Sequence, residues 1–286
     1  MDLILNNPFA PVLAVSLVAA LVLAVIARLT RSCFVATLAA PMVFLVAYVA
    51  TYQKIPPFPP VGASNKVFYV ALVATLALLA FDAIGRVPRS ALAVAASLLA
   101  AAWVGSTKLA APDATTLTLF VVLVAGGGVG LWGLDRLATL SSPLGGGAAA
   151  LAGLAAVSVL SAPTLLFGGS STGVGLCLGL AAGAALLSTE NLGVRRVLAP
   201  AAMLGAGSGL AASLDTIALV TRRADPFALA LIALAPFLGP WAVRRLPPAL
   251  RNHPLVGWIV SGLAVLSPLP VIMALLLLRH ENPLGT

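Results

Sequence analysis

Apolar residues fill ten stretches of the chain, and each stretch is about as long as a membrane-spanning helix. A helix of about 20 mainly apolar residues crosses the roughly 30 Å hydrocarbon core of a bilayer. Short segments containing Arg, Lys, Pro or Gly separate the stretches, as loops between transmembrane helices do. The sequence therefore predicts an all-α, polytopic membrane bundle of about ten transmembrane helices. The predicted spans are 9–29, 34–51, 67–84, 90–106, 115–137, 144–167, 172–188, 197–220, 226–243 and 255–278.

Composition agrees with a chain that lies mostly in lipid. Hydrophobic residues make up 61% of its 286 positions and charged residues only 8%, whereas about a quarter of the residues of a soluble protein are charged. No polar stretch is long enough to form a separate domain, so residues 1–286 are predicted to be one transmembrane domain. Possible halves at 1–140 and 141–286 would contain five spans each, as in inverted-repeat transporters, but the halves show no clear sequence similarity.

Basic residues beside the spans indicate which loops face the cytoplasm, because Lys and Arg accumulate in short cytoplasmic loops. With ten spans and an outer N-terminus, ten of the 16 basic residues lie inside and six outside. The pair Arg222-Arg223 is the main exception. Arg greatly outnumbers Lys, and Ala, Leu and Val are abundant, which is typical of a GC-rich bacterial genome. We therefore expect a bacterial inner membrane protein with both termini outside.

Glycine is concentrated in the middle of the chain, where residues 126–209 hold 19 of the 26 glycines yet remain apolar. Several of these glycines recur every four residues, which places them on one face of a helix. Small residues on such a face let helix backbones approach closely within a bilayer. A substrate path lined by bare backbone is the alternative. The predicted glycine-zipper faces are Gly126 with Gly130, Gly175 with Gly179 and Gly183, and Gly205 with Gly209.

The longest polar segment is the predicted outer loop at 52–66, with the sequence YQKIPPFPPVGASNK. Its proline pairs favour polyproline II, an extended conformation without internal hydrogen bonds. The loop either lies over the outer helix ends, anchored by interfacial aromatic residues, or offers a protein partner a preformed binding surface. The residues that would make such a surface are Pro56, Pro57, Phe58, Pro59 and Pro60.

Asp215 is the acidic residue that the predicted spans place most clearly inside the membrane. Its position is about five residues inside the outer end of a helix, which is about 8 Å below the interface. Acidic residues at this depth are costly and usually face a cavity, a partner charge or a proton pathway. Arg222 follows two turns later on the same helical face, so a buried ion pair is the structural alternative. Ser208 and Thr216 are polar neighbours on the same span.

Prolines interrupt the last two predicted spans. Pro236 and Pro240 lie four residues apart in the ninth span, and Pro268 and Pro270 lie within the tenth. Each proline removes a backbone donor and frees a carbonyl, which lipid cannot satisfy. We therefore expect broken helices near the C-terminus. Transporters build substrate and ion sites at such breaks, and kinked packing helices are the alternative.

Several kinds of chemistry find no support in the sequence. His253 and His280 are the only histidines and lie at opposite ends of the predicted bundle, so they cannot hold a haem together. The two cysteines, Cys33 and Cys177, lie in no motif with metal-ligand spacing. The basic residues are scattered and form no patch for nucleic acid. We expect no catalytic residue, no metal, no cofactor and no nucleic-acid partner, and we expect membrane lipids around the bundle.

Two functional classes remain. A secondary carrier for a small solute or lipid would use the glycine-rich centre, the broken helices and Asp215. A non-catalytic membrane subunit that docks on a larger complex would use the outer loop. The carrier is the preferred interpretation.

The predicted orientation can be tested by cysteine labelling after Cys33 and Cys177 have been replaced. A cysteine at Ser64 should react with an impermeant thiol reagent added to intact cells, and a cysteine at Asn252 should not, because the arginine distribution places them on opposite sides. Labelling in the opposite order would reverse the proposed topology.

Overall fold

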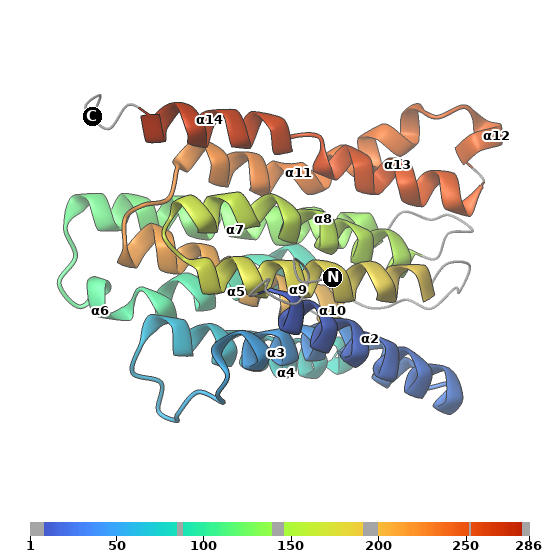
Figure 1. Cartoon of the computed structure of the whole chain (residues 1–286), viewed down its shortest axis with the longest axis horizontal. Helices are drawn as coiled ribbons and strands as arrows, with labels where there is room; N and C mark the ends of the chain where they lie inside the picture. The colour runs from blue at the N-terminus through green and yellow to red at the C-terminus, as the bar shows by residue number, and fades with distance from the viewer. Residues whose placement is uncertain (1–8, 85–87, 139–145, 191–199, 252, 282–286) are drawn as a thin grey trace.

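A computed structural model describes residues 9–84, 88–138, 146–190, 200–251 and 253–281. Within these ranges the chain is helical and has no strand, which confirms the all-α prediction. The long helices run side by side along the longest axis of the molecule, and the chain passes back and forth between its two ends (Figure 1).

The helices begin and end close to the boundaries predicted from the apolar runs. Local signals account for several of these ends: Ser32 accepts a hydrogen bond from the Val35 N–H and caps one helix, and proline lies in the first turn of three others. The helices are α2 (Ala10–Thr30), α3 (Cys33–Tyr52), α4 (Ala63–Ile84), α5 (Arg89–Val104), α6 (Ser106–Leu109), α7 (Ala114–Ala138), α8 (Gly146–Phe167), α9 (Ser171–Glu190), α10 (Pro200–Asp215), the π-helix η1 (Thr216–Val220), α11 (Pro226–Arg245), α12 (Pro248–Arg251), α13 (Pro254–Leu266) and α14 (Leu269–Glu281).

Seven helical stretches in the described part of the chain are long and apolar enough to cross a membrane. This finding fits a multi-pass membrane protein. The seven stretches are Ala10–Thr30, Phe34–Tyr52, Ala114–Leu137, Gly147–Phe167, Ser171–Glu190, Pro226–Arg245 and Leu255–Arg279. The other three predicted spans coincide with shorter apolar helices at Ala63–Ala77, Arg89–Val104 and Leu204–Val220. Ten crossings therefore stay a prediction.

The structure corrects two details of the predicted helices. The ninth predicted span is not broken, because α11 continues as one helix through Pro236 and Pro240. The outer loop is shorter than 52–66, since Tyr52 ends α3 and Ala63 begins α4. The tenth predicted span is interrupted, as Pro268 lies in the turn between α13 and α14.

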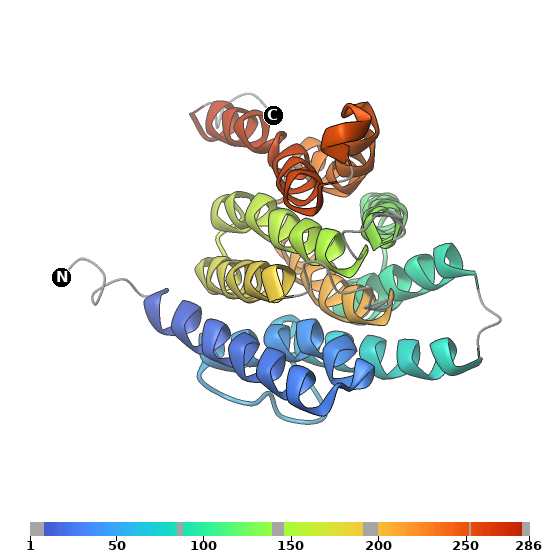
Figure 2. The ribbon, with the colours of Figure 1, turned by 90° about the vertical axis from the view of Figure 1, so that its right-hand side faces the viewer.

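Viewed along the bundle, the helices form layers (Figure 2). Helices α2, α3 and α4 lie on one side, and α11, α13 and α14 lie on the other, with α7, α8, α9 and α10 between them. Helix α10 contacts α3, α4, α5, α7 and α8, so it occupies the centre of the bundle. Helices α9 and α10 come from the second predicted half but pack on helices of the first, and the division at residue 140 stays a prediction.

Glycines on α9 and α10 lie where neighbouring helices come very close. A methyl group at Gly179 would lie 2.7 Å from Ser16 Oγ on α2 and 3.1 Å from Ala47 Cβ on α3. A methyl group at Gly209 would overlap the Phe44 ring. Side chains at these positions would force the helices apart, as expected for small-residue contacts in membranes.

The remaining glycines of these faces show the same crowding. Gly183 and Gly205 leave no room for a methyl group, because Val43 and Thr75 occupy the space. A methyl group built on Gly175 would lie 3.3 Å from the Phe9 ring. The glycine faces of α9 and α10 therefore turn toward protein, although the stabilising effect of the glycines is a prediction.

We expect Gly179→Leu to destabilise the protein by about 1–3 kcal/mol, because the larger side chain must displace α2 or α3. The matched control is Ala185→Leu, which adds a leucine to the exposed side of the same helix. Thermal unfolding in detergent measures both variants. Equal melting temperatures for the two variants would contradict close packing at this face.

Candidate functional site

The most distinctive site is a cavity of about 410 Å³ between α7, α8, α10 and α11. Its lining on α7 extends over residues 122–134, which is about 18 Å at 1.5 Å per residue. Val122 and Leu234 lie at its edge and are 50% and 56% exposed. Both residues lie on helices that are long and apolar enough to cross a membrane, so the exposed edge of the cavity lies between α7 and α11.

Almost all of the cavity wall is apolar. The lining residues other than Asp215 are Val, Leu, Ile, Ala, Gly and Pro. The short side chains of α7 and α10 leave this space open: a methyl group at Gly126 would still lie 4.0 Å from Ala233 Cβ. Gly126 and Gly130 thus line a cavity, in addition to facing α11.

Asp215 is the one ionisable residue among those that line the cavity, and it is only 4% exposed. It is the last residue of α10 and comes directly before the π-helix η1. A π-helical turn is uncommon and occurs frequently at functional sites. The described residues include no hydrogen-bond donor or cation bound to the Asp215 carboxylate. That Asp215 belongs to a substrate or ion pathway stays a prediction.

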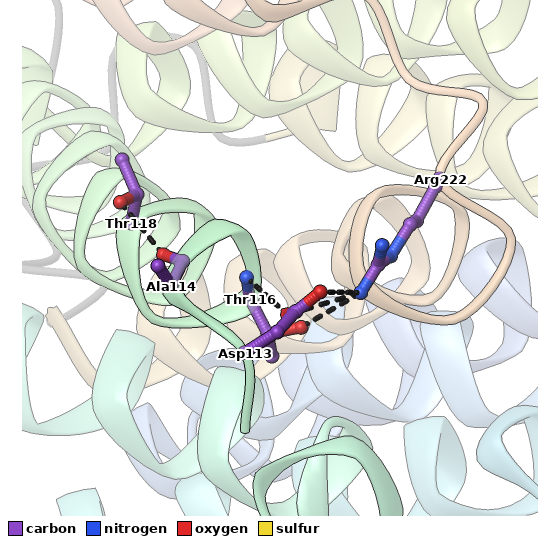
Figure 3. A network of polar contacts seen from close by, with 5 residues as sticks. All are labelled: Asp113, Ala114, Thr116, Thr118 and Arg222. Atoms are coloured by element: carbon purple, nitrogen blue, oxygen red, sulfur yellow. Dashed lines mark hydrogen bonds and ion pairs between the residues drawn. The ribbon is translucent and has the colours of Figure 1, made fainter. Parts of the chain in front are cut away.

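The structure does not have the ion pair between Asp215 and Arg222 that was the structural alternative. Arg222 instead donates from Nη2 to both carboxylate oxygens of Asp113, at 3.2 and 3.1 Å, and to Thr116 Oγ1 at 2.9 Å (Figure 3). The helix ends before Arg222, which has a left-handed backbone with φ of 55°. The helical face shared with Asp215 therefore stops short of it, and the side chain turns to the start of α7.

Asp113 and Arg222 join two loops at the same end of the bundle. The Asp113 carboxylate accepts a hydrogen bond from the Thr116 N–H at 2.8 Å. Thr116, through its hydroxyl and its backbone N–H, and the Arg222 guanidinium lower the pKa of Asp113 to about 2. The network therefore holds a fully ionised carboxylate opposite Arg222 at neutral pH.

Two further carboxylates have partners that the sequence did not reveal. Asp225 caps α11 by accepting from the Phe227 and Ala228 N–H groups, and its second oxygen lies 2.6 Å from Arg279 Nη1. The Asp225 side chain is buried even though the residue lies in a loop. Asp135 lies 3.6 Å from Arg89 on α5. An N-cap pattern, Asp before Pro-Phe-Ala, was the available signal for Asp225.

The other polar candidates on the Asp215 span satisfy their own helix. Ser208 is buried and donates to the Leu204 carbonyl, and Thr216 donates to the Ala212 carbonyl at 2.8 Å. Neither lines the cavity. Both residues therefore act locally on the backbone, a common alternative for hydroxyl side chains within helices.

Of the four prolines predicted to interrupt helices, Pro236 lines the cavity and the other three do not. Pro236 lines the cavity together with Asp215. Its missing N–H leaves the Ile232 carbonyl without its usual helical donor, and Ile232 also lines the cavity. Pro240 lies one turn further along α11, and Pro268 and Pro270 lie at the junction of α13 and α14. Of the four prolines, only Pro236 lines the same cavity as Asp215.

The outer loop is fixed by aromatic residues. Tyr69 donates to the Pro56 carbonyl at 2.9 Å, Tyr48 donates to the Ser64 carbonyl at 3.0 Å, and the Phe58 ring packs edge-on against Tyr69. Phe58 is nevertheless 78% exposed. The remaining candidates, Pro57, Pro59 and Pro60, lie in the same segment. The loop thus has the predicted anchoring together with an exposed apolar tip.

Groups of three or more His, Cys, Asp or Glu side chains that could hold a metal ion do not occur in the described ranges. Comparison with known proteins gives no further guide, since no family model, no curated protein and no solved structure matches the chain.

The Asp113–Arg222 network predicts a specific pattern in a double-mutant experiment. Asp113→Asn and Arg222→Gln should each lower the melting temperature slightly, and the double variant should be no less stable than either single variant. Asp215→Asn combined with Arg222→Gln should instead show additive effects. Coupling between Asp215 and Arg222 would contradict the assigned pairing.

The same network predicts a pH dependence. The pKa of Asp113 is below its ordinary value of about 3.9, so the ionised carboxylate stabilises the folded protein above pH 4. This contribution should be lost as the pH falls toward the folded pKa of about 2. The melting temperatures of the wild type and Asp113→Asn should therefore converge over this range. A difference that persists at pH 2 would count against the assignment.

Proposed function

We propose that the protein is a secondary carrier for a small solute, and that the cavity beside Asp215 is its binding site. The observation that carries the proposal is the buried carboxylate, without a partner among the described residues, on the wall of an apolar cavity. A charge in this position is costly, and ionisable residues within membrane helices are usually functional. The π-helix that follows Asp215 supplies backbone irregularity beside it, and Pro236 of α11 supplies a second irregularity elsewhere on the cavity wall.

The proposed topology has ten crossings in a bacterial inner membrane, with the N-terminus outside. Contacts between loops support it: Asp113 meets Arg222 and Asp225 meets Arg279 at one end, whereas Arg28 meets Glu190 near the other. These pairs join loops that an alternating ten-span path places on the same side. Several inner-loop arginines (Arg86, Arg195 and Arg196) and Asn252 lie outside the described residues.

A non-catalytic membrane subunit is the second candidate, and the outer loop favours it. Ile55, Phe58 and Val61 expose large apolar side chains on a loop that Tyr48 and Tyr69 hold in place. A fixed, exposed apolar surface suits a protein partner. The carrier remains preferred, because a docking subunit has no need of a charged residue at a cavity.

Reconstitution tests the proposal directly. Proteoliposomes are offered radiolabelled sugars, amino acids, organic anions and amines, under imposed proton and sodium gradients. At least one solute should accumulate in a protein-dependent way, and Asp215→Asn should abolish its uptake while melting temperature changes little, because the carboxylate has no partner to lose.

Glu190→Gln is the matched control, since it removes a carboxylate far from the cavity that is paired with Arg28. It should leave uptake unchanged. Absence of uptake for every solute, combined with copurification of a second chain that is lost when Phe58 is changed to Ser, would favour the subunit instead.

A further inference from the structure

We propose that the cavity selects a hydrophobic organic cation, an amine or quaternary ammonium with an apolar body, and that Asp215 is its counter-ion. The inference rests on the proposed function only in taking this cavity as the binding site, and it names the substrate class.

The charge of the cavity points to a cation. Asp215 is the one lining residue that can carry charge, and the basic residues nearest to it along the chain lie elsewhere. Arg222 binds Asp113 and Thr116. Arg223 lies beside the turn after α8, where a methyl group built on Gly169 would be 3.2 Å from its Nη1 atom. A bound cation would supply the compensating charge that a buried carboxylate requires.

The wall chemistry selects an organic cation over a metal ion. Hard cations such as Ca²⁺ and Mg²⁺ take six or more oxygen ligands, counting retained water. Among the lining residues Asp215 offers the only side-chain oxygens, which is too few for such an ion. A cation whose charge is surrounded by alkyl or aromatic groups needs few oxygen ligands, and its apolar body matches the Val, Leu and Ala wall.

Size and access agree with this class of ligand. The cavity volume of about 410 Å³ lies within the range of about 300–1,000 Å³ typical of small-molecule sites. Val122 on α7 and Leu234 on α11 are exposed at its edge, which would face lipid in the proposed topology. Hydrophobic cations partition into the bilayer, so they would reach Asp215 sideways through this edge.

An isosteric pair of probes separates the charge from the shape. Benzyltrimethylammonium is a permanent cation, and neopentylbenzene has the same shape with carbon in place of the charged nitrogen. The purified full chain in detergent should bind the cation at least about tenfold more tightly than the neutral probe, because burying Asp215 unpaired is costly. Equilibrium binding of both labelled compounds measures this ratio.

Three variants test whether Asp215 causes the preference for the cationic probe. Asp215→Asn should reduce the preference for the cation to less than about threefold, whereas Glu190→Gln should retain it. Ala211→Phe, which places a ring on the cavity wall, should weaken binding of both probes. Equal binding of the two probes by the wild type would overturn the inference even if Asp215→Asn failed to fold. So would a cation preference that survives in Asp215→Asn.

The outcome is separable from that of the carrier proposal. Selective cation binding without flux of any solute would retain the site and its ligand class but reject the carrier. Asp215-dependent flux of a neutral or anionic solute, without cation preference, would retain the carrier and reject this inference.

Discussion

Close approach of helices on α9 and α10 is the constraint on which the rest of this bundle depends. Lipid is as apolar as leucine, so burying an apolar face stabilises helix packing far less in a bilayer than in water. Dispersion contacts must then act over short distances, and these require small residues. Gly179 meets Ser16 and Ala47 in this way, and Gly209 meets Phe44. Helix α10 can lie against five other helices because most of its residues are Gly, Ala or Ser.

The same small residues have the opposite effect on α7. There Gly126 and Gly130 face Ala233 on α11, and no larger side chain fills the space between the two helices. A cavity therefore remains. Cavities in packed proteins lower stability roughly in proportion to their volume. An open space on this scale is therefore the part of the bundle that packing alone does not explain, and the proposed ligand binding would account for both the space and the carboxyl group on its wall.

Sequence reasoning located the helices well because their main determinant is local, namely an apolar run of bilayer length ended by proline, glycine or charge. It also placed Asp215 within an apolar helical stretch, since position within a span can be counted along the chain. It failed on the partner of Arg222, because the helix ends before that residue and a left-handed backbone redirects it. Asp113 lies 109 positions earlier, and no periodicity connects two loops so far apart. The cavity was likewise beyond reach, since it arises from three-dimensional packing of four helices.

The position of Arg222 explains why Asp113 has an ion-pair partner and Asp215 has none among the described residues. Asp113 lies near Arg222 in space, and Asp215 lies near it along the chain. The single guanidinium of Arg222 can contact both oxygens of only one of these carboxylates. The exposed carboxylate Asp113, supported by Thr116, holds the guanidinium at the loop. Arg222 is consequently held at the loop and does not neutralise Asp215 on the cavity wall. The loop network thus affects which charges the cavity contains, although none of its residues lines the cavity.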